Sequence, residues 1–278
     1  MILAIEGSAF LISIVLITLF EKCIPALGAK KLYYLSIFLS FWLIMNTLFY
    51  LTKSQELMAI SQHIKYISVV SVPVLFLLAI YEYTIKTAYL RMQKAAWLWI
   101  VPAITIIAIS TNSYTHLFWN SYQIDMNGNI PFFMTQNGIL FWVHTGYSYF
   151  VIGLGILLLL RRAITSPKLY SKQSMFILFG CLFSWIPNIY FILQEKSNSI
   201  MIDPTPLSML LTMAVFYWGL FRMTKNEILP MARNLVIENM SDMVIVVDKS
   251  NTIIDVNQSC ISFINNQNYA EIIIGSNL

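Results

Sequence analysis

Few side chains in this sequence of 278 residues are of the types that carry out catalysis or bind metals. Its three cysteines form no Cys-x-x-Cys pair, and it contains no glycine-rich phosphate-binding loop. His116 lies in a long polar segment and His144 follows soon after it. The two could form a ligand or metal site, but two imidazoles without a carboxylate or thiolate are a poor set of zinc ligands. We therefore expect no catalytic residue, no metal and no cofactor in this chain, and the sequence leaves open whether the protein is an enzyme.

The composition predicts a membrane protein. Hydrophobic residues make up 58% of the chain and charged residues 11%, and the mean hydropathy is +0.70. Soluble domains contain about 25% charged residues, so the expected partner of this chain is a lipid bilayer. The net charge of +4 does not indicate nucleic-acid binding, because the basic residues are distributed according to the membrane topology.

One apolar stretch, residues 138–160, organises the topology. At about 1.5 Å per residue, a helix of this length crosses a hydrocarbon core of about 30 Å with some tilt. Six more apolar runs complete a predicted bundle of seven transmembrane helices: residues 3–20, 32–51, 64–82, 95–110, 174–193 and 206–221. The expected fold class is an all-α membrane protein, a seven-transmembrane helix bundle.

Positive charges predict the orientation of this bundle. Arg161 and Arg162 directly follow the stretch 138–160, and arginines at the end of a span favour the cytoplasm. With that end inside, most of the 17 Lys and Arg residues fall in segments on the cytoplasmic side: Lys22, Lys30, Lys31, Lys86, Arg91, Lys94, Arg161, Arg162, Lys168, Lys172, Arg222, Lys225 and Arg233. The external segments contain only Lys53, Lys65 and Lys196. We therefore expect the N-terminus outside the cell and the C-terminus in the cytoplasm.

The longest predicted external segment, residues 111–137, contains no Lys or Arg. It carries a cluster of aromatic rings: Tyr114, Phe118, Trp119, Tyr122, Phe132 and Phe133. Turn-forming residues at 125–129 and at Pro131 predict either a small hairpin or a re-entrant lid. We expect this segment to lie on the membrane surface over the outer half of the bundle.

Polar residues at membrane depth are further candidates for a functional site, because such groups are costly in lipid and usually face the bundle interior. Asn188 directly follows Pro187, so it either binds carbonyls freed by a proline kink or contacts a ligand. Glu82 lies near the cytoplasmic end of its span, where it can reach water or pair with Lys86, four residues later.

The pattern changes after residue 221. Residues 222–238 form a charged, helix-prone connector in which Ile228 and Leu235 have the spacing of a coiled-coil seam, as would suit a homodimer. Two apolar runs on either side of a turn at residues 248–251 predict a β-hairpin. About 40 residues with one hairpin cannot build an independent core, so we expect the chain to be cut short of a complete domain.

A series of short motifs accompanies the predicted spans: Pro102, Asn112, His116-Leu117-Phe118-Trp119, Phe141-Trp142-x-His144 with Tyr147 and Tyr149, Ser166-Pro167-x-Leu169-Tyr170, Pro187-Asn188 and Asp203-Pro204-Thr205-Pro206. Their order and spacing, over about residues 3–225, resemble the N-terminal seven-transmembrane sensor region of bacterial histidine kinases. The resemblance implies a multi-pass protein of the bacterial cell membrane. We take six residues in its outer half as candidates for ligand binding or signalling: His116, Trp119, Trp142, His144, Tyr147 and Asn188.

A second series of motifs follows: Ala232-Arg233, Glu238-Asn239-Met240-Ser241-Asp242, Val246-x-Asp248 and Ile254-Asp255-Val256-Asn257. These resemble the entry into a PAS domain, an α/β module whose first two strands are paired and followed by a short helix. The expected regions are a sensor domain at 1–221, a signalling linker helix at 222–238 and an incomplete PAS domain at 239–278. In proteins of this kind a histidine kinase, a diguanylate cyclase or another output follows, so the implied partners are a missing output domain and a response regulator.

The expected function is that of a membrane sensor. A small molecule or a membrane stimulus would engage the outer half of the bundle beneath residues 111–137, and the shifted helices would move the linker and the PAS region. The alternative is a multi-pass transporter or permease, which predicts internal repeats and charges at the membrane midplane. The sequence shows no clear repeat, an odd number of spans and little midplane charge, and so favours the sensor.

Overall fold

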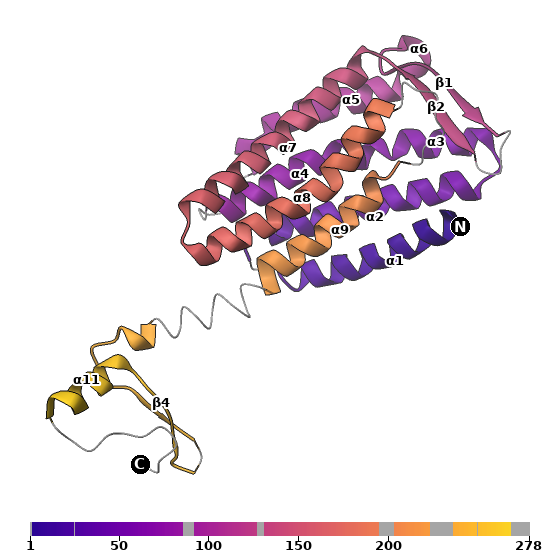
Figure 1. Ribbon diagram of the computed structural model, residues 1–278. Coiled ribbons are helices and arrows are strands. Elements are labelled where there is room, and N and C mark those ends of the chain that lie inside the picture. Colours follow the sequence, from indigo (N-terminus) through magenta and orange to yellow (C-terminus); the bar gives the residue numbers. More distant parts are fainter. Residues whose placement is uncertain are drawn as a thin grey trace. The chain divides into compact units, whose positions relative to one another are not determined.

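The computed structural model describes residues 2–24, 26–85, 92–126, 131–194, 203–222, 236–248 and 250–267. The chain divides into two compact units, Met1–Phe221 and Arg222–Leu278. The first unit is a bundle of helices with a small hairpin at one end, and the second contains another small hairpin and a helix (Figure 1).

The helices of the first unit close on themselves into a ring. In chain order they are α1 (Ile2–Glu21), α2 (Ala29–Leu51), α3 (Gln55–Ile64), α4 (Tyr66–Ile85), the 3-10 helix η1 (Met92–Trp99), α5 (Ile100–Ser110), α6 (Asn112–Thr115), α7 (Ile139–Thr165), α8 (Lys168–Gln194), α9 (Thr205–Tyr217) and the π-helical turn η3 (Trp218–Arg222). Helix α2 packs between α1 and α4, α4 packs on α7, α7 on α8, and α8 on α9. Because α9 also contacts α1 and α2, the last helix closes the ring.

Five helical segments are long and apolar enough to cross a membrane, judged by length and composition: Ile2–Glu21, Ala29–Leu51, Gln55–Ile85, Ile139–Thr165 and Tyr170–Leu193. Two more apolar helices, Ala95–Ser110 and Thr205–Phe221, are shorter. All of the predicted apolar runs therefore lie on helices, but only five of these helices reach the length of a full span within the part of the chain that the structure describes.

The third span begins earlier than the predicted run at residues 64–82. The hydroxyl of Ser54 accepts a hydrogen bond from the backbone N–H of Leu57 and caps α3, a helix that lies mostly outside the predicted apolar runs. A turn at Lys65 then leads directly into α4. This helix was missed because α3 is amphipathic, with Met58 buried and Leu57 exposed, and so lacks the continuous apolar character of a span.

Apolar side chains fill the interior of the bundle and also cover its outside. The main core includes Phe20, Leu39, Leu43, Ile80 and Phe216, all of which are almost completely buried. Large apolar side chains also point outward from most of the helices, for example Leu11, Ile107, Phe150, Ile164 and Leu193. Such a continuous apolar exterior is what a bilayer covers.

Residues 111–137 form a hairpin beside the short helix α6. Strand β1 (Trp119–Asp125) pairs antiparallel with β2 (Phe132–Asn137), so that Tyr122 lies opposite Thr135 and Ile124 opposite Phe133. Of the two predicted arrangements, hairpin or re-entrant lid, the structure has the hairpin. The residues at its tip, 127–130, lie outside the described ones. We call this end of the bundle, with β1, β2 and α3, the hairpin end (Figure 1).

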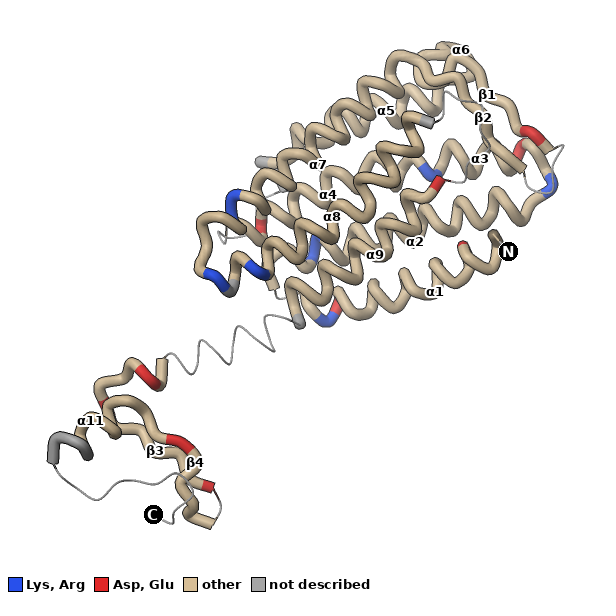
Figure 2. Tube along the Cα trace, viewed as in Figure 1, with Lys and Arg blue, Asp and Glu red and all other residues tan. Residues whose placement is uncertain are grey.

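Basic residues gather at the opposite end of the bundle, which we call the basic end. Figure 2 shows them at the turn between α1 and α2 and at the connection between α7 and α8. They are Lys22, Lys30, Lys31, Arg161, Arg162, Lys168 and Lys172. The hairpin end carries Lys53 and Lys65. The asymmetry that the sequence predicted is thus present in three dimensions.

The second unit contains strands β3 (Ile245–Val247) and β4 (Ile253–Val256), paired antiparallel as predicted, and helix α11 (Gln258–Gln267). The Asp248 carboxylate accepts hydrogen bonds from the backbone N–H groups of Thr252 and Ser250, each 2.8 Å long. These bonds close the turn and hold the pKa of Asp248 below its ordinary value. The coiled-coil positions proposed for the linker, Ile228 and Leu235, lie outside the described residues.

Helices α8 and α9 pack at a distance that only glycine permits. A Cβ atom at Gly180 would lie 2.4 Å from Cγ1 of Val215 on α9. An exchange of Gly for Ala inside a helix normally favours the helix by about 1 kcal/mol, but overpacking costs about 1–3 kcal/mol. We expect G180A to lower the thermal unfolding temperature of the purified protein. The added substitution V215A should restore part of the loss, because it removes Cγ1 but keeps the Cβ atom, which would lie 2.9 Å away.

Gly153 on α7 provides the matched control, because a Cβ atom there would meet nothing within 4 Å. The variant G153A should unfold at the same temperature as the unchanged protein or slightly above it. Equal unfolding temperatures for G180A and G153A would contradict the close packing of α8 on α9.

Candidate ligand site

A cavity of about 270 Å³ lies inside the bundle beneath the hairpin. Its walls come from α2, α4, α7, α8 and α9, and the hairpin and the end of α3 border it at the hairpin end. Small-molecule sites in proteins are mostly apolar hollows of about 300–1,000 Å³. The size of this cavity therefore suits one small ligand.

Trp119 of the hairpin covers one side of the cavity. Its side chain is almost completely buried and lies edge-on to the rings of His63 and Tyr66, with centroids 4.9 Å and 5.5 Å away. Phe118 and Phe133 also lie next to it, at 5.1 Å and 5.4 Å. Aromatic pairs at such distances contribute about 0.5–1.5 kcal/mol each beyond area burial. Of the ring cluster predicted in residues 111–137, Phe118, Trp119 and Phe133 form the packed cover of the cavity, whereas Tyr114 is 89% exposed.

A single buried side chain, Asn112, holds the start of the hairpin in place. The Asn112 amide donates to the carbonyl of Trp119 at 3.1 Å, and its oxygen accepts from the N–H groups of Phe118 and Trp119, both at 3.0 Å. Asn112 thus satisfies three backbone groups where α6 ends and β1 begins. It ties the hairpin to the end of α5, from which α6 continues.

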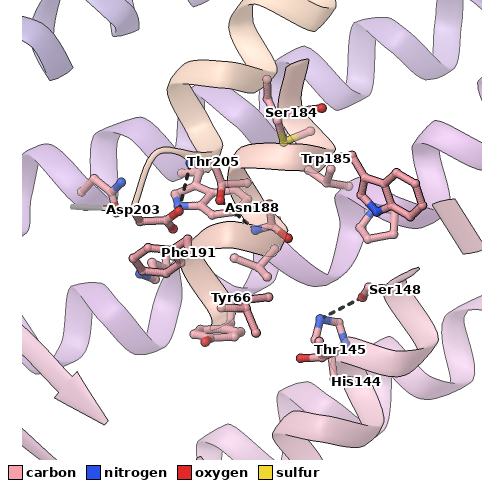
Figure 3. A pocket seen from close by; sticks show the side chains of 18 of the residues that line it. Tyr66, His144, Thr145, Ser148, Ser184, Trp185, Asn188, Phe191, Asp203 and Thr205 are labelled. Carbon is pink, nitrogen blue, oxygen red and sulfur yellow. Dashed lines mark hydrogen bonds between the residues drawn. The ribbon is translucent and has the colours of Figure 1, made fainter. Parts of the chain in front are cut away.

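Asn188 joins three helices on the opposite side of the cavity. The Tyr149 hydroxyl on α7 donates to the Asn188 oxygen at 2.6 Å, and the Asn188 amide donates to the Thr205 hydroxyl on α9 at 2.8 Å. The Asp203 carboxylate in turn accepts from the Thr205 N–H at 2.9 Å. Figure 3 shows Asn188, Thr205 and Asp203 together at the cavity. These contacts bridge helices rather than pair with carbonyls freed by a kink, and because Asn188 also lines the cavity, its predicted role in ligand binding stays a prediction.

His144 lines the same cavity and is only 4% exposed. Its Nε2 atom lies 3.3 Å from the Ser148 hydroxyl, as Figure 3 shows, whereas its Nδ1 atom has no hydrogen-bond partner among the described residues. The indole nitrogens of Trp42 and Trp185, which also line the cavity, have no partner within the described ranges either. The cavity is thus bordered by three buried nitrogen atoms that could bond to a ligand.

The other three sequence candidates lie away from the cavity. His116 is exposed and ends α6 in a left-handed conformation, with φ of 50°. Trp142 is 43% exposed, and the Tyr147 hydroxyl donates to the carbonyl of Leu98 on η1. His116 and His144 therefore do not come together as a pair. The part of the chain that the structure describes holds no group of three or more His, Cys, Asp or Glu residues that could bind a metal ion.

Several lining residues were missed from the sequence. They include Trp42, Tyr66, Trp185 and the two charged lining residues, Lys65 and Asp203. For Trp42 a signal was available. Asn46, a polar residue at membrane depth that also lines the cavity, follows it by four residues and therefore lies on the same helix face. The others come from α4, from α8, from the turn before α4 and from the segment before α9, and no spacing within one helix could have brought them together.

A second polar cluster lies at the basic end of the bundle. Lys31 of α2 and Glu82 of α4 are both buried and form an ion pair with 3.4 Å between Nζ and Oε1. The predicted alternatives for Glu82 were contact with water or a pair with Lys86, which lies outside the described residues. The actual partner comes from another helix, because α2 packs directly on α4.

A chain of hydrogen bonds beside this ion pair connects four helices. The Arg162 guanidinium on α7 donates to the carbonyl of Tyr83 and lies over its ring, 3.9 Å from the centroid. The Tyr83 hydroxyl donates to the Gln173 oxygen at 2.9 Å, and the Gln173 amide donates to the Gly219 carbonyl at 2.5 Å. Contacts therefore run from α7 through α4 and α8 to η3, where the first unit ends.

These features define a class of protein, a multi-helix membrane bundle with a covered cavity at one end and a buried polar network at the other. The model of one family, the N-terminal 7TM region of histidine kinase, matches residues 7–230 of the chain. The chain belongs to this family, and the resemblance of its membrane region is confirmed. A comparison with curated proteins found no match. The protein is accordingly a multi-pass membrane module of signal transduction.

The contacts of Asn112 predict how the cover of the cavity can be loosened. The variant N112A leaves three buried backbone groups without their partner, at about 1–3 kcal/mol for each group. We expect residues 118–137 to lose protection from hydrogen exchange, measured by mass spectrometry on the purified protein, while α8 and α9 keep theirs. The exposed residue Asn120, substituted as N120A, is the control and should leave protection unchanged. Unchanged exchange in N112A would show that the aromatic cluster alone holds the hairpin.

Proposed function

We propose that this chain is the sensor module of a bacterial signal-transduction protein, in which a small molecule held in the cavity changes the position of α9 and hence of the cytoplasmic region. The family supports a sensor module rather than a transporter. The stimulus is external or membrane-borne, and the output is a PAS domain followed by a histidine kinase or a diguanylate cyclase. The PAS part rests on the sequence motifs and on the small antiparallel hairpin β3–β4.

The observation that carries this proposal is that the same helices border the cavity and the polar network. Helix α7 contributes His144 to the cavity and Arg162 to the network, and α8 contributes Asn188 and Gln173. Helix α9 begins at the cavity with Thr205 and continues into η3, whose Gly219 accepts from Gln173. A ligand that moves α7 or α8 therefore acts directly on the point where the linker starts.

A ligand shifts such an equilibrium only if it binds one arrangement of the helices more tightly than the other. Coupling free energies between sites are typically about 1–3 kcal/mol, equivalent to a 5- to 150-fold change in the ratio of two states. The rings and helix-bridging bonds at the cavity can supply a difference of this size, because one hydrogen bond or aromatic contact contributes about 1 kcal/mol.

The proposed topology places seven helices across the membrane, with the hairpin end outside and the basic end in the cytoplasm. The gathering of Lys and Arg at the basic end supports this orientation. The two shorter apolar helices, Ala95–Ser110 and Thr205–Phe221, would complete the seven crossings. We further propose that two copies of the chain meet through the linker at residues 222–238, so that a movement of α9 changes how the two linkers pack.

A side chain that fills the cavity tests the signalling proposal. Ser148 lines the cavity, and S148F should imitate a bound ligand and change the autophosphorylation of a histidine-kinase core joined through a complete PAS domain. We expect a change of at least fivefold in either direction. Val143 on the same helix is 51% exposed and does not line the cavity, so V143F is the control and should leave the output unchanged. Equal output from both variants, with both proteins folded, would overturn the proposal.

Reporter fusions test the proposed orientation. An enzyme active only outside the cytoplasm, fused after Asn127, should be active, and the same enzyme fused after Arg233 should be inactive. A reporter that fluoresces only in the cytoplasm should give the reverse pattern. Activity of one reporter at both positions would contradict the topology and, with it, the route from an external cavity to a cytoplasmic output.

A further inference from the structure

Three buried nitrogen atoms around the cavity indicate what kind of ligand it binds. The side chains of Trp42 and His144 are 5% and 4% exposed, and Trp185 is partly buried. The Nε1 atoms of both tryptophans and the Nδ1 atom of His144 have no partner among the described residues. An indole N–H can only donate a hydrogen bond. Two of the three groups therefore require an acceptor.

The third group can also be a donor. The Nε2 atom of His144 lies 3.3 Å from the Ser148 hydroxyl, which can donate to it. A neutral imidazole that accepts at Nε2 carries its proton at Nδ1. The cavity then presents three donors, on α2 (Trp42), α7 (His144) and α8 (Trp185), and a ligand that satisfies them carries carbonyl or similar acceptor oxygens.

The walls and charges of the cavity further limit the class of ligand that it can bind. Rings of Tyr66, Trp119 and Phe141 line it, and aromatic walls favour a flat aromatic ligand. Among the described lining residues, Lys65 and Asp203 are charged, and their charges are opposite. In the view of Figure 3, Asp203 lies at one side of the cavity and Trp185 and His144 at the other. A ligand with a net charge gains nothing from this balance, whereas a neutral one avoids the cost of desolvating an ion.

We propose that the cavity binds a neutral aromatic carbonyl compound of the quinone class, held by the indole N–H groups of Trp42 and Trp185 and by His144. This inference rests on the proposed sensor function and names the ligand class of the same site. A quinone combines a flat ring, two acceptor oxygens and no donor, and it dissolves in a bilayer. It therefore reaches a cavity enclosed by membrane helices without passing through water.

Two probes of the same shape test the ligand class on the unchanged chain. Menadione has a methylnaphthalene ring system with two carbonyl oxygens, and 2-methylnaphthalene has the ring system without them. Binding to the purified full chain is measured by isothermal titration calorimetry in detergent, with protein-free micelles as the blank. We expect saturable menadione binding that is at least tenfold tighter than that of 2-methylnaphthalene. Equal affinities, or no saturable binding of menadione, would overturn the proposal.

Substitution of one donor then locates the binding site. W185F removes the N–H group and keeps an aromatic ring, and it should weaken menadione binding about fivefold to tenfold and leave 2-methylnaphthalene unaffected. Trp97 on η1 is 61% exposed and does not line the cavity, so W97F should bind menadione as the unchanged chain does. Thermal unfolding of both variants shows whether they are folded. If W185F and W97F lose the same affinity for menadione, or if W185F loses none, menadione binds elsewhere and the proposal is overturned.

The binding experiment and the signalling experiment test the ligand class and the sensor function separately. Calorimetry measures binding to the chain without an output domain, so a negative result there contradicts only the proposal that the ligand is a quinone. The sensor function is then still tested by the response of S148F. If menadione binds as expected but S148F and V143F give equal output, the sensor proposal falls and the ligand assignment stands.

Discussion

Polar groups inside a lipid-embedded bundle have no water to bond with, so each of them depends on a partner within the protein. In the described structure these partners come from other elements of the chain. Asn112 holds the backbone of the hairpin, Asn188 bridges α7 and α9, and Lys31 pairs with Glu82 across two helices. Apolar packing holds the helices together, but these directional contacts determine how far each helix is rotated and shifted against its neighbours.

Both ends of the bundle combine hydrogen-bonded and unpaired buried groups. At the basic end, Arg162, Tyr83 and Gln173 form a continuous set of bonds that reaches Gly219. At the cavity, the nitrogen atoms of Trp42 and Trp185 have no partner among the described residues. At the basic end, too, the carboxylate oxygens of Glu82 have no hydrogen-bond partner among the described residues, although Glu82 forms an ion pair with Lys31. Unpaired groups in a low dielectric are costly, so a molecule that pairs with them is favoured. The cavity at the hairpin end is where we propose that a ligand supplies such partners.

The order of helices and hairpins was predictable from the sequence, whereas the composition of the site was only partly so. Continuous apolar runs predict spans because lipid contacts most faces of a helix, and turn formers predicted the hairpin of residues 111–137. The rotation of each helix was not predictable. Trp142 and His144 are two residues apart on α7 and so lie on different faces, but the sequence did not show that His144 rather than Trp142 faces the cavity. Contacts between helices set this rotation, and for the same reason the partner of Glu82 was not foreseen.

The end of α9 shows how such contacts can carry a signal. Helix α9 changes to π-helical geometry at Trp218–Arg222, and irregular turns of this kind often occur at functional sites. The carbonyl of Gly219 accepts from Gln173, so this turn depends on the position of α8 as well as on its own backbone. Asn188 lies on the same helix α8 as Gln173, at the cavity. A shift of α8 along or around its axis therefore changes the cavity and the end of α9 together.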